Sequence, residues 1–137
     1  MKQSTTLISI IVLVSFVLST CFSIHAYSTS NTHATMTINS FEKGGSGGGP
    51  SECDGKYHSD DTPIVALSSQ WYANGKRCFK NININYQGRS VQAMVVDECD
   101  SSRGCKDDIV DASKAVWNAL QVPKSQWGWT GVDWSDA

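Results

Sequence analysis

The 137-residue sequence has little excess charge of either sign, with 11 basic and 13 acidic residues. A protein that binds nucleic acid or an anionic membrane needs a basic surface, so both partners are excluded. The sequence also lacks an Asn-x-Ser/Thr acceptor for N-glycosylation and a Cys-x-x-Cys pair. Cysteines at that spacing are typical of structural zinc sites. We therefore expect no metal and no cofactor.

Long hydrophobic runs are scarce as well, and the one present lies at the N-terminus. It extends from Leu7 to Leu18 behind Lys2, and residues 24–26 offer a cleavage site. The run is too short and too close to the N-terminus for a membrane span, so residues 1–26 are predicted to be a signal peptide. We expect a secreted protein without membrane contact after cleavage.

The rest of the chain has the size of one compact domain. Residues 27–32 are predicted to form a short tail, and residues 33–137 the domain. Four cysteines remain there: Cys53, Cys78, Cys99 and Cys105. An even number in an exported chain indicates two disulfides, and the sequence alone permits three pairings.

Alternating polar and apolar residues predict several strands. Residues 34–39 form the first, residues 82–86 and 91–95 form a hairpin around Gln87-Gly88, and residues 132–134 form the last. The glycine-rich segment 44–50 has the composition of a flexible linker.

Two short helices are also predicted. The first begins at Pro63 with Thr62 as its cap, and ends at Asn74-Gly75. The second covers residues 112–120 with Asp111 as its N-cap, and Trp117 is expected to be half-buried beside its apolar face. Strands outnumber helices, which favours a small closed β-barrel with helical crossovers, because closure removes exposed strand edges.

Several longer motifs resemble those of the plant kiwellin family, also called ripening-related proteins. They are GGGPSECDG at 47–55, YHSD at 57–60, VALSSQWY at 65–72, KRC at 76–78, VVDECDS at 95–101, IVDASKAVW at 109–117 and WSDA at 134–137.

Kiwellins resemble barwin and the first domain of expansins, which implies a mainly β fold: a six-stranded double-psi β-barrel with short crossover helices. The same resemblance places the glycine-rich segment inside the domain, across one barrel face. It also implies the disulfides Cys53–Cys78 and Cys99–Cys105.

The resemblance further implies a non-enzymatic protein of plant defence or ripening in the apoplast. Some kiwellins bind and block secreted microbial proteins such as chorismate mutases. The alternative is expansin-like binding of cell-wall polysaccharide, or weak lytic activity. The Cys-rich N-terminal module of longer kiwellins is missing here, so its activities are not carried over. A monomer is expected.

Hydrolysis is not expected, although two acids match those of glycan-cleaving relatives of the barrel. Asp111 matches their general acid, and Asp97 matches the acid that ends a barrel strand. The base of those enzymes lies on the first strand, where this chain has Thr35, Thr37 and Asn39. Inverting hydrolysis requires a second carboxylate, so we expect no enzyme, and we expect Asp97 to order its loop.

The candidate binding residues lie in three segments. Asp97, Asp100 and Arg103 belong to the segment that Cys99–Cys105 would close into a rigid recognition loop at the barrel rim. Trp127 and Trp129 could stack on a sugar, anchor a protein partner or pack at the barrel mouth. His58 and Asp60, in the motif at 57–60, complete the set.

Overall fold

The computed structural model describes residues 30–137, so the predicted signal peptide lies outside the described residues. The strands are β1 (Thr32–Ile38), β2 (Ile64–Ser68), β3 (Asn81–Tyr86), β4 (Arg89–Cys99), β5 (Ile109–Ala112) and β6 (Trp129–Asp136). Two α-helices, α2 (Ser69–Tyr72) and α3 (Lys114–Ala119), and two 3-10 turns, Ser101–Arg103 and Lys124–Gln126, complete the elements. None of the described helices is long and apolar enough to cross a membrane.

The six strands close into a barrel in the order β1-β5-β2-β4-β3-β6. The pairs β1/β5 and β2/β4 are parallel, and the other four pairs are antiparallel. A parallel pair needs a long crossover between its strands, and two such crossovers interlock here. The predicted mainly β, double-psi barrel is confirmed.

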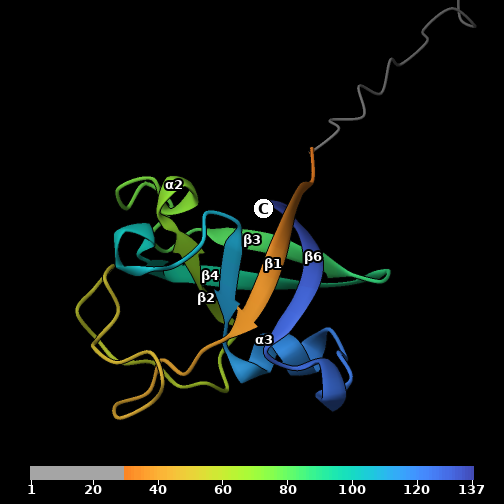
Figure 1. The fold of residues 1–137 in the computed structure, drawn as a ribbon, viewed down its shortest axis with the longest axis horizontal. Coiled ribbons are helices and arrows are strands. Elements are labelled where there is room, and N and C mark those ends of the chain that lie inside the picture. Colours follow the sequence, from red (N-terminus) through yellow and green to blue (C-terminus); the bar gives the residue numbers. More distant parts are fainter. Residues whose placement is uncertain (1–29) are drawn as a thin grey trace, which may run out of the picture.

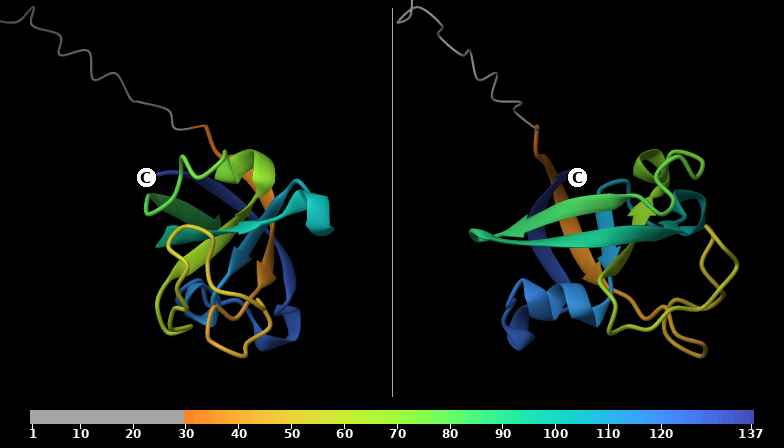
Figure 2. Two further views of the ribbon diagram at one scale, coloured as in Figure 1. Left: turned by 90° about the vertical axis from the view of Figure 1, so that its left-hand side faces the viewer. Right: turned by 180° about the vertical axis from the view of Figure 1, so that it is seen from behind.

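Figure 1 shows α2 and α3 near opposite ends of the barrel, with β1 and β6 side by side. The long β1–β2 loop, residues 39–63, projects from one side, and the tip of the β3–β4 hairpin projects from the other (Figure 2). The two protruding segments are therefore far apart.

The β3–β4 hairpin was predicted correctly because its signals are local. Ile82 and Ile84 are fully buried, and the asparagines that alternate with them, Asn81, Asn83 and Asn85, are not. Gln87 and Gly88 both have positive φ, 47° and 80°, as a tight two-residue hairpin turn requires.

The helix predicted from Pro63 is wrong, because residues 64–68 form strand β2. All five residues are buried: Val65 and Leu67 in the barrel core, Ile64 and Ala66 beneath Phe41 in a second apolar cluster. A strand covered on both faces has a continuous apolar run, which periodicity cannot distinguish from a helix. Only the last part of the predicted helix remains, as the four-residue α2.

The second predicted helix is shorter than expected, and two of its assignments are wrong. Asp111 lies inside β5, and Ser113 takes the N-cap position of α3 without a side-chain cap bond. Trp117 is fully buried rather than half-buried, and its indole N–H donates to the Thr37 carbonyl at 3.3 Å. The helix packs Val116 and Trp117 against the barrel, so Ala119 faces solvent.

Candidate functional site

A polar groove of about 530 Å³ crosses the barrel where the β1–β2 loop faces the ends of β4 and β5. Five carboxyl side chains and one guanidinium line it: Glu52, Asp97, Glu98, Asp100, Asp111 and Arg103. We call it the acidic groove. On its floor, Ala66 of β2 is in register with Asp97 on one side and Asp111 on the other. The small Ala66 side chain leaves the space between the two carboxylates open.

One wall of the groove is the glycine-rich segment, which is anchored rather than free. The buried Asp60 carboxylate accepts bonds from the Phe41 N–H at 2.8 Å and the Ser40 hydroxyl at 2.6 Å. Gly47 lies so close to the chain before it that a Cβ there would be 2.5 Å from the Ser40 carbonyl oxygen. The segment is therefore part of the domain, as the family resemblance implied.

Residues 44–48 match the sequence motif Gly-x-Ser-x-Gly with Ser46 at its centre, but the surroundings of Ser46 are not those of a nucleophile. Its hydroxyl accepts the Ser40 N–H at 3.1 Å and lies in a loop, whereas the hydrolase elbow is a strand-to-helix turn.

Asp97 ties the two walls of the groove together. One of its carboxylate oxygens accepts both the Glu52 N–H and the Glu98 N–H, each at 2.8 Å. Burial raises the pKa of Asp97, and the two N–H bonds oppose this shift. Asp97 therefore orders its loop, as predicted, and it lines the groove.

Asp111 is held from the neighbouring strand. The Thr37 hydroxyl of β1 donates to its Oδ1 at 2.6 Å, because Thr37 and Asp111 are paired in the parallel register of β1 and β5. Burial raises the pKa of Asp111, with a further contribution from the charge of Asp97 and an opposing one from the Thr37 bond. The strand position, rather than a helix cap, directs this carboxyl to the groove.

The opposite wall is the recognition loop, residues 99–105, closed by the disulfide Cys99–Cys105. Asp100 caps the 3-10 turn and accepts the Ser102 hydroxyl at 2.6 Å and the Ser102 N–H at 2.9 Å. These bonds lower the pKa of Asp100. Arg103 forms a salt bridge with Asp100, with Nε 3.4 Å from Oδ2, and its side chain is 86% exposed. Asp100 therefore stabilises the loop from within, and most of the Arg103 side chain remains exposed to solvent.

The second disulfide, Cys53–Cys78, joins the β1–β2 loop to the turn after α2. Both disulfides have the pairing implied by the family resemblance. Cys53 also donates its N–H to the Val96 carbonyl at 3.1 Å, so the neighbouring Glu52 is fixed at the groove edge.

The other candidates do not line the acidic groove. His58 pairs with Asp54 at 3.1 Å, and Asp60 is buried at the base of the glycine-rich segment. Trp127 packs against Trp117 at 5.8 Å between ring centroids. Each of these side chains is already engaged inside the protein.

Trp129 does not line the acidic groove, but it lies two strands from Asp111, with Thr37 of β1 between them. It lies opposite Thr37 in the β1–β6 register, with its side chain 58% exposed, and Lys106 Nζ is 4.8 Å from its ring centroid. The sequence singled out Trp129 but neither Thr37 nor Lys106 as part of a site. Their proximity arises from strands distant in the sequence, so no local motif marks it.

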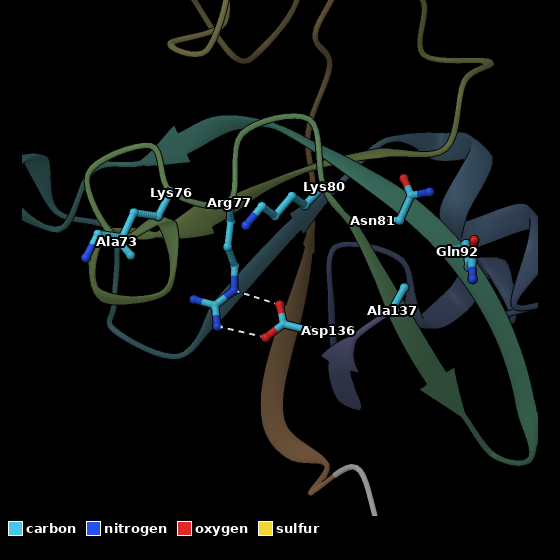
Figure 3. Close-up of a pocket in the computed structure, with 8 residues that line it drawn as sticks. All are labelled: Ala73, Lys76, Arg77, Lys80, Asn81, Gln92, Asp136 and Ala137. Atoms are coloured by element: carbon cyan, nitrogen blue, oxygen red, sulfur yellow. Dashed lines mark hydrogen bonds and ion pairs between the residues drawn. The ribbon is translucent and has the colours of Figure 1, made fainter. Parts of the chain in front are cut away.

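A larger cleft of about 780 Å³ lies elsewhere, between the turn after α2 and the end of β6. Figure 3 shows the Arg77 guanidinium facing the Asp136 carboxylate, at 2.8 and 3.1 Å. Arg77 also donates to the Trp71 carbonyl at 2.6 Å and lies over the Trp134 ring. These paired charges hold the end of β6 in place, so we assign the candidate site to the acidic groove.

Within residues 30–137, no group of three or more His, Cys, Asp or Glu side chains could hold a metal ion. The fold and the groove define a double-psi β-barrel with an acidic cleft. An expansin from Clavibacter michiganensis has the same fold, with a TM-score of 0.62 and 23% identity over 79% of this chain and 50% of its own. So does the Streptomyces papain inhibitor, with a TM-score of 0.60 and 22% identity over 77% of this chain and 93% of its own.

The family model described as Kiwellin-1 matches residues 15–137, and the chain belongs to the kiwellin family. It is 54% identical to a ripening-related protein of rice, Oryza sativa subsp. japonica, over 80% of this chain. Ripening-related protein grip22 of Vitis vinifera is 53% identical, and kiwellin of Actinidia chinensis var. chinensis is 49% identical, each over 80% of this chain.

The chain spans only part of these relatives: 62% of the rice protein, 54% of grip22 and 56% of kiwellin. The relatives are plant ripening-related proteins, and the motifs that indicated the family lie within the matched residues.

Proposed function

We propose that this protein is a secreted, non-enzymatic plant protein that binds other proteins in the apoplast through the recognition loop. Its targets are secreted microbial proteins, with chorismate mutases as the first class to test. One observation carries the proposal: a disulfide-closed loop presents Arg103 to solvent at the rim of a groove rich in carboxylates.

The loop is ordered before any partner arrives. Besides its disulfide and the Asp100 cap, the Ser101 N–H donates to the Ser69 hydroxyl at 3.0 Å. The Ser68 hydroxyl donates to the Lys106 carbonyl at 2.6 Å, just after the loop. A loop held in one conformation loses little entropy on association. An exposed arginine beside carboxylates supports charge-paired recognition of a protein surface.

The carboxylates of the groove support binding rather than hydrolysis. One Asp97 oxygen is occupied by two backbone N–H groups, and one Asp111 oxygen by Thr37. Neighbouring β1 contributes hydroxyl groups but no carboxylate to this region, whereas inverting glycosidases need an acid and a base in one site. Incubation with cellulose, xylan and chitin should therefore release no reducing sugar.

Two features support secretion and protein binding. Disulfides persist in oxidising compartments, and two stabilise this domain. The Streptomyces papain inhibitor, by its name an inhibitor of a protein, has the same fold.

The proposal is tested with Arg103→Ala against a panel of secreted microbial chorismate mutases. Affinity should fall about tenfold or more, as for exposed arginines at binding hot spots. The melting temperature should remain unchanged, because Arg103 is exposed. Arg89→Ala is the matched control, since this exposed arginine lies at the β3–β4 hairpin, away from the groove (Figure 2). If Arg103→Ala binds as tightly as wild type, the recognition surface lies elsewhere.

A second candidate function is binding of cell-wall polysaccharide, with or without weak lytic activity. The observation that favours it is the exposed Trp129 beside Thr37 and Asp111. A mutant of the Clavibacter expansin has also been solved in complex with cellohexaose, with a TM-score of 0.62 to this chain.

A further inference from the structure

We propose that Trp129 is a sugar-stacking subsite at the end of the acidic groove, and that Lys106 covers it when no ligand is bound. The ligand class is a neutral glycan, one of whose pyranose rings lies on the indole face. The inference rests on the second candidate function, polysaccharide binding, and assigns residues and a ligand class to it.

The exposure of Trp129 needs an explanation, because the other tryptophans are packed inside the protein. Trp117 and Trp134 are buried, and Trp71 and Trp127 pack against them. Trp129 remains 58% exposed on a regular strand. A large aromatic surface left in water is stabilised when a ligand covers it. Trp129 therefore resembles a binding platform rather than a core residue.

The neighbours of Trp129 are groups that bind sugar hydroxyls. Thr37 lies directly opposite it in the strand register, and Asp111 lies next to Thr37 on the other side. Because Thr37 occupies Asp111 Oδ1, the second oxygen can accept a hydrogen bond from a hydroxyl group. A pyranose has an apolar face for the indole and hydroxyl groups at its edge for Asp111. The arrangement across β6, β1 and β5 therefore suits a single sugar ring.

Lys106 occupies the place over the ring that the sugar would take. Its Nζ lies 4.8 Å from the Trp129 centroid, and it forms no salt bridge with any described residue. The backbone of Lys106 is fixed by Ser68, but its long side chain can move. An exposed cation–π contact is weak, so a stacked sugar can displace the ammonium group.

The charge of the groove selects the ligand class. Four carboxyl groups, Glu52, Asp97, Glu98 and Asp111, line the groove next to the proposed subsite, and Asp111 is two strands from Trp129. An acidic glycan such as an oligogalacturonide would be repelled by them, whereas a neutral glycan would not.

The test measures binding of cellohexaose and of an uncharged xylo-oligosaccharide by calorimetry, with an oligogalacturonide for comparison. Trp129→Ala should weaken binding of the neutral ligands about tenfold or more. Phe79→Ala is the matched control, because it removes another exposed aromatic, one that lies in the turn before β3 rather than beside Thr37. Lys106→Ala should leave the affinity for neutral ligands unchanged or raise it, since the substitution removes the competing side chain.

Each result separates the inference from the functions proposed above. If the wild type binds cellohexaose and Trp129→Ala binds it equally well, the subsite is wrong and the polysaccharide function stands. If the wild type binds neither neutral ligand, the Trp129 subsite and the polysaccharide function are both rejected. The proposal of protein binding through Arg103 is unaffected by that result. Tighter binding of the oligogalacturonide would overturn the ligand class. If Lys106→Ala binds the neutral ligands more weakly than wild type, Lys106 does not cover the subsite in competition with the sugar.

Discussion

Two aspartates of the acidic groove differ in what holds them. Asp97 accepts two backbone N–H bonds and joins two loops, whereas Asp111 accepts one hydroxyl bond from a neighbouring strand. Burial raises the pKa of both groups. Ionisation of either carboxyl group therefore lowers the free energy of unfolding. A carboxyl group that destabilises the folded protein at neutral pH is a candidate for function.

The raised pKa of Asp111 predicts a pH-dependent effect of Asp111→Asn. Wild-type Asp111 keeps its proton in the folded chain at pH values where the unfolded chain, with a pKa near 3.8, has lost it. Its contribution to stability is therefore largest below that value and falls as the pH rises through the folded pKa. The asparagine does not titrate and can still accept the Thr37 bond.

Asp111→Asn should therefore gain stability relative to wild type between about pH 3 and about pH 7. Urea unfolding at both pH values, with the exposed Asp107→Asn as control, measures this difference. A difference between Asp111→Asn and wild type that does not change with pH would show that the Asp111 pKa is the same in the folded and unfolded chains.

At the scale of elements, the end of β6 is held by one arginine as well as by strand pairing. Arg77, in the turn after α2, binds Asp136 through two hydrogen bonds and the Trp71 carbonyl through a third. It also lies 5.3 Å from the Trp134 ring centroid. These contacts join α2 to the last strand, close to where Cys78 binds the β1–β2 loop.

Arg77→Ala should lower the free energy of unfolding by about 1–3 kcal/mol, the usual effect of removing a charged, hydrogen-bonded partner. Arg77→Lys keeps the charge but loses the planar guanidinium group, and should recover only part of the loss. Urea unfolding followed by tryptophan fluorescence measures both. If Arg77→Ala unfolds at the same urea concentration as wild type, β6 is held by barrel pairing alone.

At the scale of the whole molecule, the two disulfides close loops of different length. Cys53–Cys78 spans 25 positions and joins the long β1–β2 loop to the turn after α2. Cys99–Cys105 spans 6 and acts only within the recognition loop. The entropy lost by the unfolded chain grows with loop length, so the longer loop should contribute more to stability.

Replacing Cys53 and Cys78 together by alanine should lower the stability by about 3.5 kcal/mol, and replacing Cys99 and Cys105 by about 2.4 kcal/mol. The second replacement should also weaken partner binding, because it frees the loop that presents Arg103. Thermal unfolding of the two double variants gives the order. A larger loss for the Cys99/Cys105 variant would contradict the entropic argument.

The sequence by itself determined the features whose signals are local. The alternation of polar and apolar residues specified the β3–β4 hairpin, and Gln87-Gly88 specified its turn. The kiwellin motifs indicated the family and, through it, the double-psi fold. Tertiary contacts decided the rest. Residues 64–68 became a strand because both of their faces are covered, one by the core and one by Phe41. Asp111 entered the groove because β5 pairs with β1, and Trp129 lies near it because β6 pairs with the other edge of β1. Asp111 is 74 positions from Thr37 in the sequence, and Trp129 is further still. Such register is set by the closed barrel, in which each strand has two neighbours, and no short segment of sequence contains that information.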